Sequence, residues 1–280
     1  MGEQVPTLDE VVRRDDVIGT SGVRLAVRVA GPADGPPVIL LHGWAQSGRV
    51  WANQLTGPLG GAYRLIAVDL RGHGDSAVPD DYGTDAWAGD VRALLAYADR
   101  PAVVVGWSYG GLVLIDYLRR YGTAGLAGLV LVGAITEIGR GHAGGRVGPV
   151  MRAALPAALS DDPAVARPAL LDFVTGMSAQ PLPDDLVDAS LRVPASVRTA
   201  LFARQAAAAE VLAAVDVPTL VLHGRQDAIV HPSAASYAAG LIPDATLTWL
   251  DTGHVPFVDH AAEFDTALAG HLGRCFGRSA

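Results

Sequence analysis

The stretch "VVVGWSYGGL" at residues 103–112 passes from a strand-like run to a helix-like run within a few residues. "PAVVV" before the serine is typical of a buried strand, and "GLVLIDYLRR" after it is typical of a helix. Between them, "GWSYG" fits the pattern G-x-S-x-G. Gly106 and Gly110 permit a sharp turn, which exposes Ser108 at the carboxyl end of a strand. This setting favours Ser108 as a nucleophile over a chance match.

Continuous apolar runs predict a parallel sheet around that strand. Short runs of this kind are typical of strands buried on both faces, and they occupy residues 38–43, 63–70, 102–107, 126–134, 219–224 and 245–251. Residues 22–31 alternate apolar and polar positions instead. This alternation predicts a half-buried strand, and "TSG" before it predicts a hairpin turn.

Helical patterns lie between these runs. Residues 84–99 place apolar side chains on one stripe, with Thr84 and Asp85 at the start, where an N-cap and an anionic first turn are favoured. The helix after Ser108 closes with "RRYG" at 119–122, a C-terminal signal. Strands and helices therefore alternate, which predicts an α/β fold with a mostly parallel sheet.

The alternation stops between residues 137 and 212. This segment has no strand-like run and consists of Ala, Pro, Leu and Gly around short helical stretches. It is too long and too apolar for a loop. We expect a helical cap over one end of the sheet, inserted between the two parts of one α/β core, residues 1–136 and 213–280.

A serine hydroxyl becomes a good nucleophile only when a neighbouring base removes its proton. His254, in "DTGHVPF", follows the last strand run and reaches the same edge of the sheet as Ser108. Asp227, in "GRQDAIV", follows another strand end and completes the chain order Ser, Asp, His. Glu137 is a second candidate for the carboxylate that orients the imidazole. We predict Ser108, Asp227 and His254 as the catalytic residues.

Attack on an acyl carbonyl creates an oxyanion that needs two positioned hydrogen-bond donors. The backbone N–H of Tyr109, directly after the serine, is one predicted donor. The backbone N–H of Trp44, in "HGWAQSG", is the other. We interpret His42 in the same loop as a structural histidine that bonds the loop backbone. His223, at the end of a strand run, is expected to pack or bond locally.

Apolar side chains near the expected site predict a pocket for a small to medium acyl group. The candidates come from the serine turn and the cap, and they are Trp107, Met151, Phe173, Met177 and Phe202. The alternative is that the cap members only form the small core of the cap itself.

Composition excludes several kinds of chemistry. The 280 residues carry a formal net charge of -8, and every basic residue is arginine. Without lysine the chain forms no Schiff base and no Walker-type phosphate loop. Cys275 is the only cysteine, which excludes a disulfide framework and a thiolate metal cluster. The acidic balance argues against nucleic acid and anionic membranes as partners. The charged N-terminus predicts a cytoplasmic protein, and no pattern indicates an oligomeric state.

Five motifs resemble the α/β-hydrolase family in order and spacing and cover nearly the whole chain. They are "LLHGWAQSGRVWANQ", "VDLRGHGDS", "VVGWSYGG", "VPTLVLHGRQDAIV" and "DTGHVPF". These motif sequences are most similar to those of the cofactor-free haloperoxidase and esterase group, also called perhydrolases. That group usually has Phe and Met where this chain has Trp107 and Tyr109. The resemblance implies an eight-stranded sheet, a cap after the sixth strand, a Ser108–Asp227–His254 triad and no metal or organic cofactor.

These features lead us to expect a serine hydrolase that cleaves a small-molecule carboxylic ester through an acyl-serine intermediate. Alternatives with the same triad are hydrolysis of a carbon–carbon bond in a dienoic keto-acid, a lactone or an amide, with peracid formation or halogenation as a side activity. Seven arginines of the predicted cap keep the keto-acid open as possible carboxylate ligands: Arg140, Arg146, Arg152, Arg167, Arg192, Arg198 and Arg204. A ligand-binding module without turnover is the third hypothesis.

Overall fold

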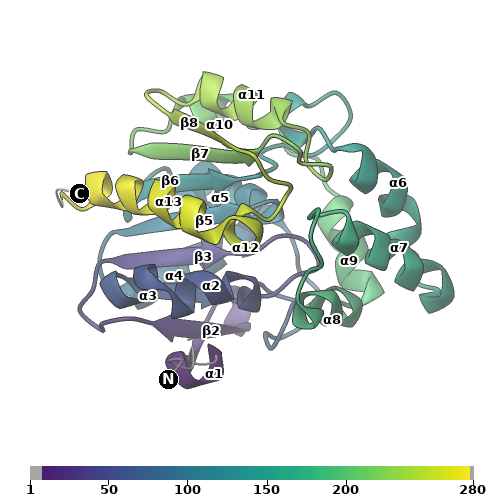
Figure 1. Cartoon of the computed structure of the whole chain (residues 1–280), viewed down its shortest axis with the longest axis horizontal. Coiled ribbons are helices and arrows are strands. Elements are labelled where there is room, and N and C mark those ends of the chain that lie inside the picture. Colours follow the sequence, from purple (N-terminus) through teal and green to yellow (C-terminus); the bar gives the residue numbers. More distant parts are fainter. Residues whose placement is uncertain (1–7, 278–280) are drawn as a thin grey trace.

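The chain folds around one eight-stranded sheet (Figure 1). The computed structural model describes residues 8–277, so residues 1–7 and 278–280 of the predicted core lie outside the described residues. The strands are β1 (Arg13–Ile18), β2 (Arg24–Ala30), β3 (Pro37–Leu41), β4 (Arg64–Val68), β5 (Ala102–Trp107), β6 (Leu126–Val132), β7 (Thr219–Gly224) and β8 (Thr246–Leu250). Their order is β1-β2-β4-β3-β5-β6-β7-β8. Pairing is antiparallel at β1–β2 and β2–β4 and parallel elsewhere, so the predicted fold is confirmed.

β1 is the strand that the hydrophobic pattern does not reveal. Its sequence, "RRDDVI", is mostly charged, and it pairs with β2 at the edge of the sheet. Charged side chains suit an edge strand because they discourage pairing with other chains. A short 3₁₀ turn at Thr20–Gly22 joins β1 to β2, which confirms the predicted hairpin turn.

Helices cover both faces of the sheet. In Figure 1, α2 (Ala52–Thr56), α3 (Pro58–Ala62), α12 (Pro256–Asp259) and α13 (Ala261–Cys275) lie in front, and α4 (Thr84–Ala98) and α5 (Tyr109–Tyr121) lie behind. The remaining helices of this part are α1 (Leu8–Val11) and α11 (Ser233–Leu241). None of the helices formed by residues 8–277 has the length and apolarity needed to cross a membrane.

The ends of α4 and α5 test the predicted capping signals. The prediction for α4 is wrong in one detail, because Gly83 has the extended backbone of the capping residue and Thr84 is already helical. Asp85 does lie in the first turn, as expected. α5 ends at Tyr121, and Gly122 follows it with a φ of 61°, which confirms that predicted end.

Between β6 and β7 the chain forms helices and no named strand. They are α6 (Pro149–Ala158), α7 (Pro163–Thr175), α8 (Asp184–Arg192), α9 (Ala195–Phe202) and α10 (Ala209–Ala213). Figure 1 shows α6 to α9 gathered at one side of the sheet. We call residues 137–212 the helical segment. One isolated bridge closes it internally, and another, Val147 to Val230, joins it to the loop after β7.

Candidate active site

Ser108 lies between β5 and α5 in a backbone conformation that few side chains adopt. Its φ and ψ are 53° and -118°, and such strain costs about 1–3 kcal/mol in a residue other than glycine. The flanking glycines permit close approach, because a Cβ on Gly106 would lie 2.8 Å from Gly110 O and one on Gly110 would lie 2.7 Å from Leu41 O. The predicted strand–turn–helix arrangement is confirmed.

Asp227 and His254 meet at the carboxyl edge of the sheet, after β7 and β8. His254 Nδ1 lies 2.7 Å from Asp227 Oδ2, and both side chains are fully buried. Asp227 Oδ1 accepts hydrogen bonds from the backbone N–H groups of Ile229 and Val230 at 2.8 and 2.9 Å. An ionised carboxylate only accepts, so Nδ1 of His254 carries the proton. Its Nε2 is therefore left with a lone pair that can act as a base.

The surroundings of Asp227 keep it ionised. Burial alone would raise its pKa, but attraction to His254 in its protonated form and hydrogen bonds from His223 and His254 outweigh burial and hold the pKa well below its usual range. His223 Nε2 lies 3.2 Å from Asp227 Oδ2 and 3.1 Å from Val230 O. The expectation that His223 bonds locally is confirmed, but its contact with Asp227 carries no signal in the sequence.

Ser108 and His254 both lie against the end of β6. The backbone N–H of Ser108 donates to Val132 O at 3.0 Å, and a Cβ on the next residue, Gly133, would lie 3.2 Å from His254 Nδ1. His254 Nε2 is buried and has no hydrogen-bond partner within residues 8–277, so no hydrogen bond links it to the serine. Such contacts are often long in the absence of substrate.

Trp107 and Met177 hold the backbone of His254 from two sides. Trp107 Nε1 donates to His254 O at 2.9 Å, and its ring lies 5.2 Å from the imidazole, measured between centroids. The backbone N–H of His254 donates to Met177 O at 2.7 Å. Sequence reasoning gave Trp107 no role beyond packing or pocket lining, because a backbone carbonyl as partner leaves no sequence motif. That these two side chains line a pocket stays a prediction.

Trp44 packs against the helical segment. The rings of Phe173 in α7 and Phe202 in α9 stand edge-on to it, with centroids 4.9 and 5.5 Å away. Met151 in α6 is buried as well. These contacts form a shared apolar core between the loop after β3 and the segment, and a pocket-lining role for the same residues stays a prediction.

The two predicted oxyanion donors keep their backbone N–H groups free of carbonyl partners. Among the backbone hydrogen bonds of residues 8–277, none is donated by Trp44 or Tyr109. The side chain of Tyr109 has a separate attachment, because its hydroxyl donates to Leu201 O at 2.8 Å and accepts from Arg204 Nε at 3.1 Å. Only the backbone of Tyr109 is therefore available to an oxyanion.

The other histidine and carboxylate candidates have structural partners. His42 Nε2 accepts from the backbone N–H of Leu70 at 2.9 Å, so Nδ1 donates to Gly43 O at 2.7 Å. Burial lowers the pKa of His42 well below its ordinary value, so the ring is neutral, and its structural interpretation is confirmed.

Glu137 accepts from the backbone N–H groups of Gly144 and Ala208. The structure thus brings Asp227, and not Glu137, into hydrogen-bond contact with His254.

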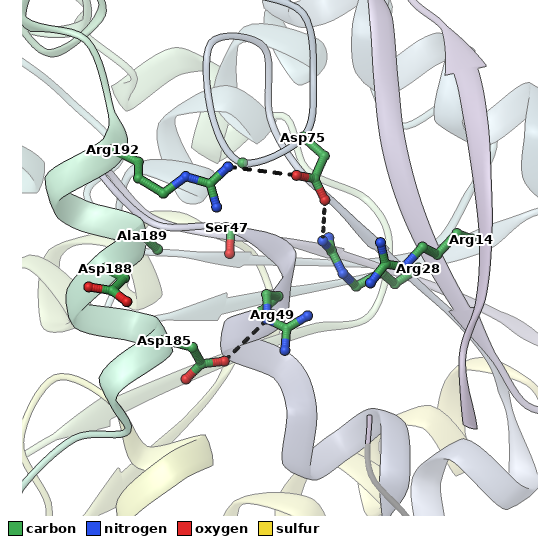
Figure 2. Close-up of a pocket in the computed structure, with 10 residues that line it drawn as sticks. Arg14, Arg28, Ser47, Arg49, Asp75, Asp185, Asp188, Ala189 and Arg192 are labelled. Carbon is green, nitrogen blue, oxygen red and sulfur yellow. Dashed lines mark hydrogen bonds and ion pairs between the residues drawn. The ribbon is translucent and has the colours of Figure 1, made fainter. Parts of the chain in front are cut away.

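A polar cavity of about 360 Å³ lies where α8 meets the core (Figure 2), and residues 106–110 of the serine turn are not among the residues that line it. Arg28 pairs with Asp75 at 2.9 Å, Arg49 with Asp185 at 3.2 Å, and Arg192 with Asp75 at 3.8 Å. Because these arginines already face aspartates, we interpret the cavity as an ion-paired junction between α8 and the core.

Comparison with known proteins gives a consistent set of relatives. The sequence profile of the Alpha/beta hydrolase family matches residues 38–267. A non-heme chloroperoxidase from Kitasatospora aureofaciens is 42% identical over 106 residues, which are 37% of this chain and only 38% of that protein. A pimeloyl-(acyl-carrier protein) methyl ester esterase from Chromobacterium violaceum is 32% identical over 247 residues, 85% of this chain and 94% of that protein. The solved structure of esterase RhEst1 from Rhodococcus sp. ECU1013 is 43% identical, with a TM-score of 0.87, and the match covers 92% of this chain and 97% of that one.

Proposed function

This chain belongs to the α/β-hydrolase family, and we propose that it is a serine hydrolase that cleaves a small to medium, apolar carboxylic ester through an acyl-serine intermediate. The observation that carries the proposal is the buried hydrogen bond between His254 and Asp227, which leaves Nε2 of His254 free beside the strand end that bears Ser108. The esterases among its relatives support an ester as the substrate.

We assign the chemical steps to these three side chains. Ser108 Oγ attacks the acyl carbon while His254 Nε2 takes the hydroxyl proton, and Asp227 stabilises the imidazolium that forms. The imidazolium then returns the proton to the leaving alcohol. Water attacks the acyl-serine with the same base, which releases the carboxylic acid and restores the serine.

The backbone N–H groups of Trp44 and Tyr109 serve as oxyanion donors in this proposal. Neither N–H has a backbone acceptor in the described part of the chain, residues 8–277. The loop of Trp44 is in close contact with the serine, because a Cβ on Gly43 would lie 2.9 Å from Ser108 Cβ. Donors positioned in advance typically supply about 3–4 kcal/mol each to the transition state.

The helical segment, residues 137–212, acts as a cap on a core made of residues 1–136 and 213–280. Its contacts with Trp44 through Phe173 and Phe202 support an apolar lining for the acyl group. The keto-acid alternative has less support. Arg198 donates to three backbone carbonyls and Arg204 pairs with a buried aspartate, so neither is free to bind a substrate carboxylate.

Peracid formation is a secondary candidate because a relative is named as a non-heme chloroperoxidase. In this reaction hydrogen peroxide replaces water as the attacking group on the acyl-serine, and a peroxycarboxylic acid leaves in place of the carboxylic acid. Purified protein given acetate and hydrogen peroxide should oxidise bromide if this activity exists, and Ser108→Ala should abolish the oxidation.

The ester proposal is tested with a chain-length series of p-nitrophenyl esters. Turnover should favour short and medium acyl chains, and Ser108→Ala should lower kcat by about 10⁴-fold or more with the fold retained. A serine-reactive fluorophosphonate should add one mass increment to the wild type and none to Ser108→Ala. Equal turnover by the two proteins, or no adduct on the wild type, would overturn the proposal and favour the binding module.

A further inference from the structure

The loop between β3 and the first turn of the following helix is held in an unfavourable conformation beside the site. Ala45 has a φ of 54°, in the left-handed region that residues other than glycine rarely occupy. Trp44, whose N–H is the proposed oxyanion donor, directly precedes it. A strained residue persists only where its surroundings hold it, so the contacts of this loop decide where the donor lies.

Those contacts come from α8 in the helical segment. Ser190 is completely buried, and its Oγ donates to Ala45 O at 2.7 Å. Gln46 Nε2 donates to the same Oγ at 2.7 Å and to Leu186 O at 3.1 Å. Because Leu186 O can only accept, the nitrogen of the Gln46 amide must face α8, and the hydroxyl proton of Ser190 must point to Ala45. The bonds therefore run in one direction, from Gln46 to Ser190 to Ala45.

α8 itself is tied to the core at its outer surface. Figure 2 shows Asp185 facing Arg49 and Arg192 facing Asp75 across the polar cavity. These ion pairs are partly exposed and weak, whereas the bonds of Ser190 are buried. The two kinds of attachment can therefore be removed separately.

We propose that Ser190 is a positioning residue for the oxyanion loop, residues 43–47. Its bond to Ala45 fixes the position of the Trp44 N–H relative to α8. The inference rests on the proposed function and adds a residue that acts through Trp44 without touching substrate. Loss of the hydroxyl releases the strained backbone of Ala45, and its relaxation shifts the adjoining Trp44 so that the Trp44 N–H moves away from the developing oxyanion.

The test compares Ser190→Ala with Asp185→Asn, which removes an outer ion pair of the same helix. With p-nitrophenyl butyrate, Ser190→Ala should lower kcat about 10- to 100-fold with KM within about twofold of wild type. This loss is smaller than the 10²–10³-fold cost of deleting a donor outright. Asp185→Asn should keep kcat within about twofold. The inhibition constant of phenylboronic acid, which forms a tetrahedral adduct on the serine, should rise in Ser190→Ala by the same factor as kcat falls.

Further variants separate positioning from general damage. Ser190→Thr retains the hydroxyl and should restore most of kcat. Should Ser190→Ala fail to fold, Gln46→Met breaks the same chain of bonds and should lower kcat several-fold at constant KM. An unchanged kcat and boronate affinity in a folded Ser190→Ala, or an equal loss in Asp185→Asn, overturns the inference. A wild type without esterase activity overturns the proposed function instead, so the two failures are distinguishable.

Discussion

The sheet and the helical segment meet at the candidate site. The interactions that hold the strands of the sheet to one another differ from those that attach the segment to the core. The central parallel strands share continuous backbone hydrogen bonds, and residues such as Val104 are fully buried between helices. The segment reaches the core through the packing of Phe173 and Phe202 on Trp44. It is also joined to the core by polar side chains that bond to backbone carbonyls, such as Ser190 to Ala45 and Tyr109 to Leu201. The three proposed catalytic side chains therefore follow strand ends of the sheet, whereas the side-chain contacts from the segment can be removed one at a time.

Asp227→Asn is the variant with the largest expected effect. It tests the catalytic role of a side chain that follows a strand of the sheet. The N–H groups of Ile229 and Val230 would bind the amide oxygen, which turns the amide nitrogen toward His254. His254 Nδ1 must then accept, its proton moves to Nε2, and the ring can no longer act as a base. We expect kcat to fall by about 10⁴-fold with little loss of stability, measured by ester hydrolysis and urea unfolding.

Glu137→Gln is the matched control for that variant, since Glu137 is the other carboxylate that the sequence allows. Its oxygens accept from Gly144 and Ala208, so the change should lower stability and leave kcat of the folded protein within a few-fold. A large loss of kcat in Glu137→Gln, or a mild effect of Asp227→Asn, would contradict the assigned roles.

The sequence allows the core residues of the site to be predicted because strand ends are visible in it. Ser108, Asp227 and His254 each follow an apolar run, and the carboxyl ends of parallel strands share one edge of a sheet. Asp227 and His254 do meet at that edge, as expected. The antiparallel β1 was missed because an edge strand needs no apolar side chains.

The contacts made by the segment could not be predicted in the same way. Ser190 is one serine in a short amphipathic helix, and its partner is a backbone carbonyl about 145 residues away in the sequence, a contact type that leaves no spacing pattern. The role of Trp107 was hidden for the same reason, since its indole N–H binds the backbone of His254. Polar contacts to the main chain emerge only when the fold is known.

Arg198→Met tests whether the helical segment can be destabilised separately from the sheet. The buried guanidinium donates to Ala158 O at 2.8 Å, to Ser160 O at 2.9 Å and to Val193 O, which joins the ends of α6 and α8. Methionine keeps the apolar length and removes the donors, so we expect a loss of about 4 kcal/mol from carbonyls left unpaired. Hydrogen exchange should rise in α6 to α9 and stay slow in β3 to β7.

Arg167→Met on the exposed side of α7 is the control for that variant, and its effect should stay within about 0.5 kcal/mol. Exchange that rises equally in the strands after Arg198→Met would mean that the two regions unfold as one unit. The separation between sheet and segment would then be wrong.

The smallest expected effect concerns the charged contact that joins the two regions, between Arg204 of the segment and Asp116 of α5 at 2.6 Å. Burial raises the pKa of Asp116 to about 6, although Arg204 opposes the rise. The folded protein thus binds this proton more tightly than the unfolded chain, whose value is about 3.8. The stability that the group contributes is largest below pH about 4 and falls as the pH rises to about 6, and it is constant above that pH. The total decrease is at most about 3 kcal/mol. The unfolding free energy of the wild type minus that of Asp116→Asn should decline across that pH window. A difference that increases with pH would show that the attraction to Arg204 outweighs the effect of burial on the pKa of Asp116.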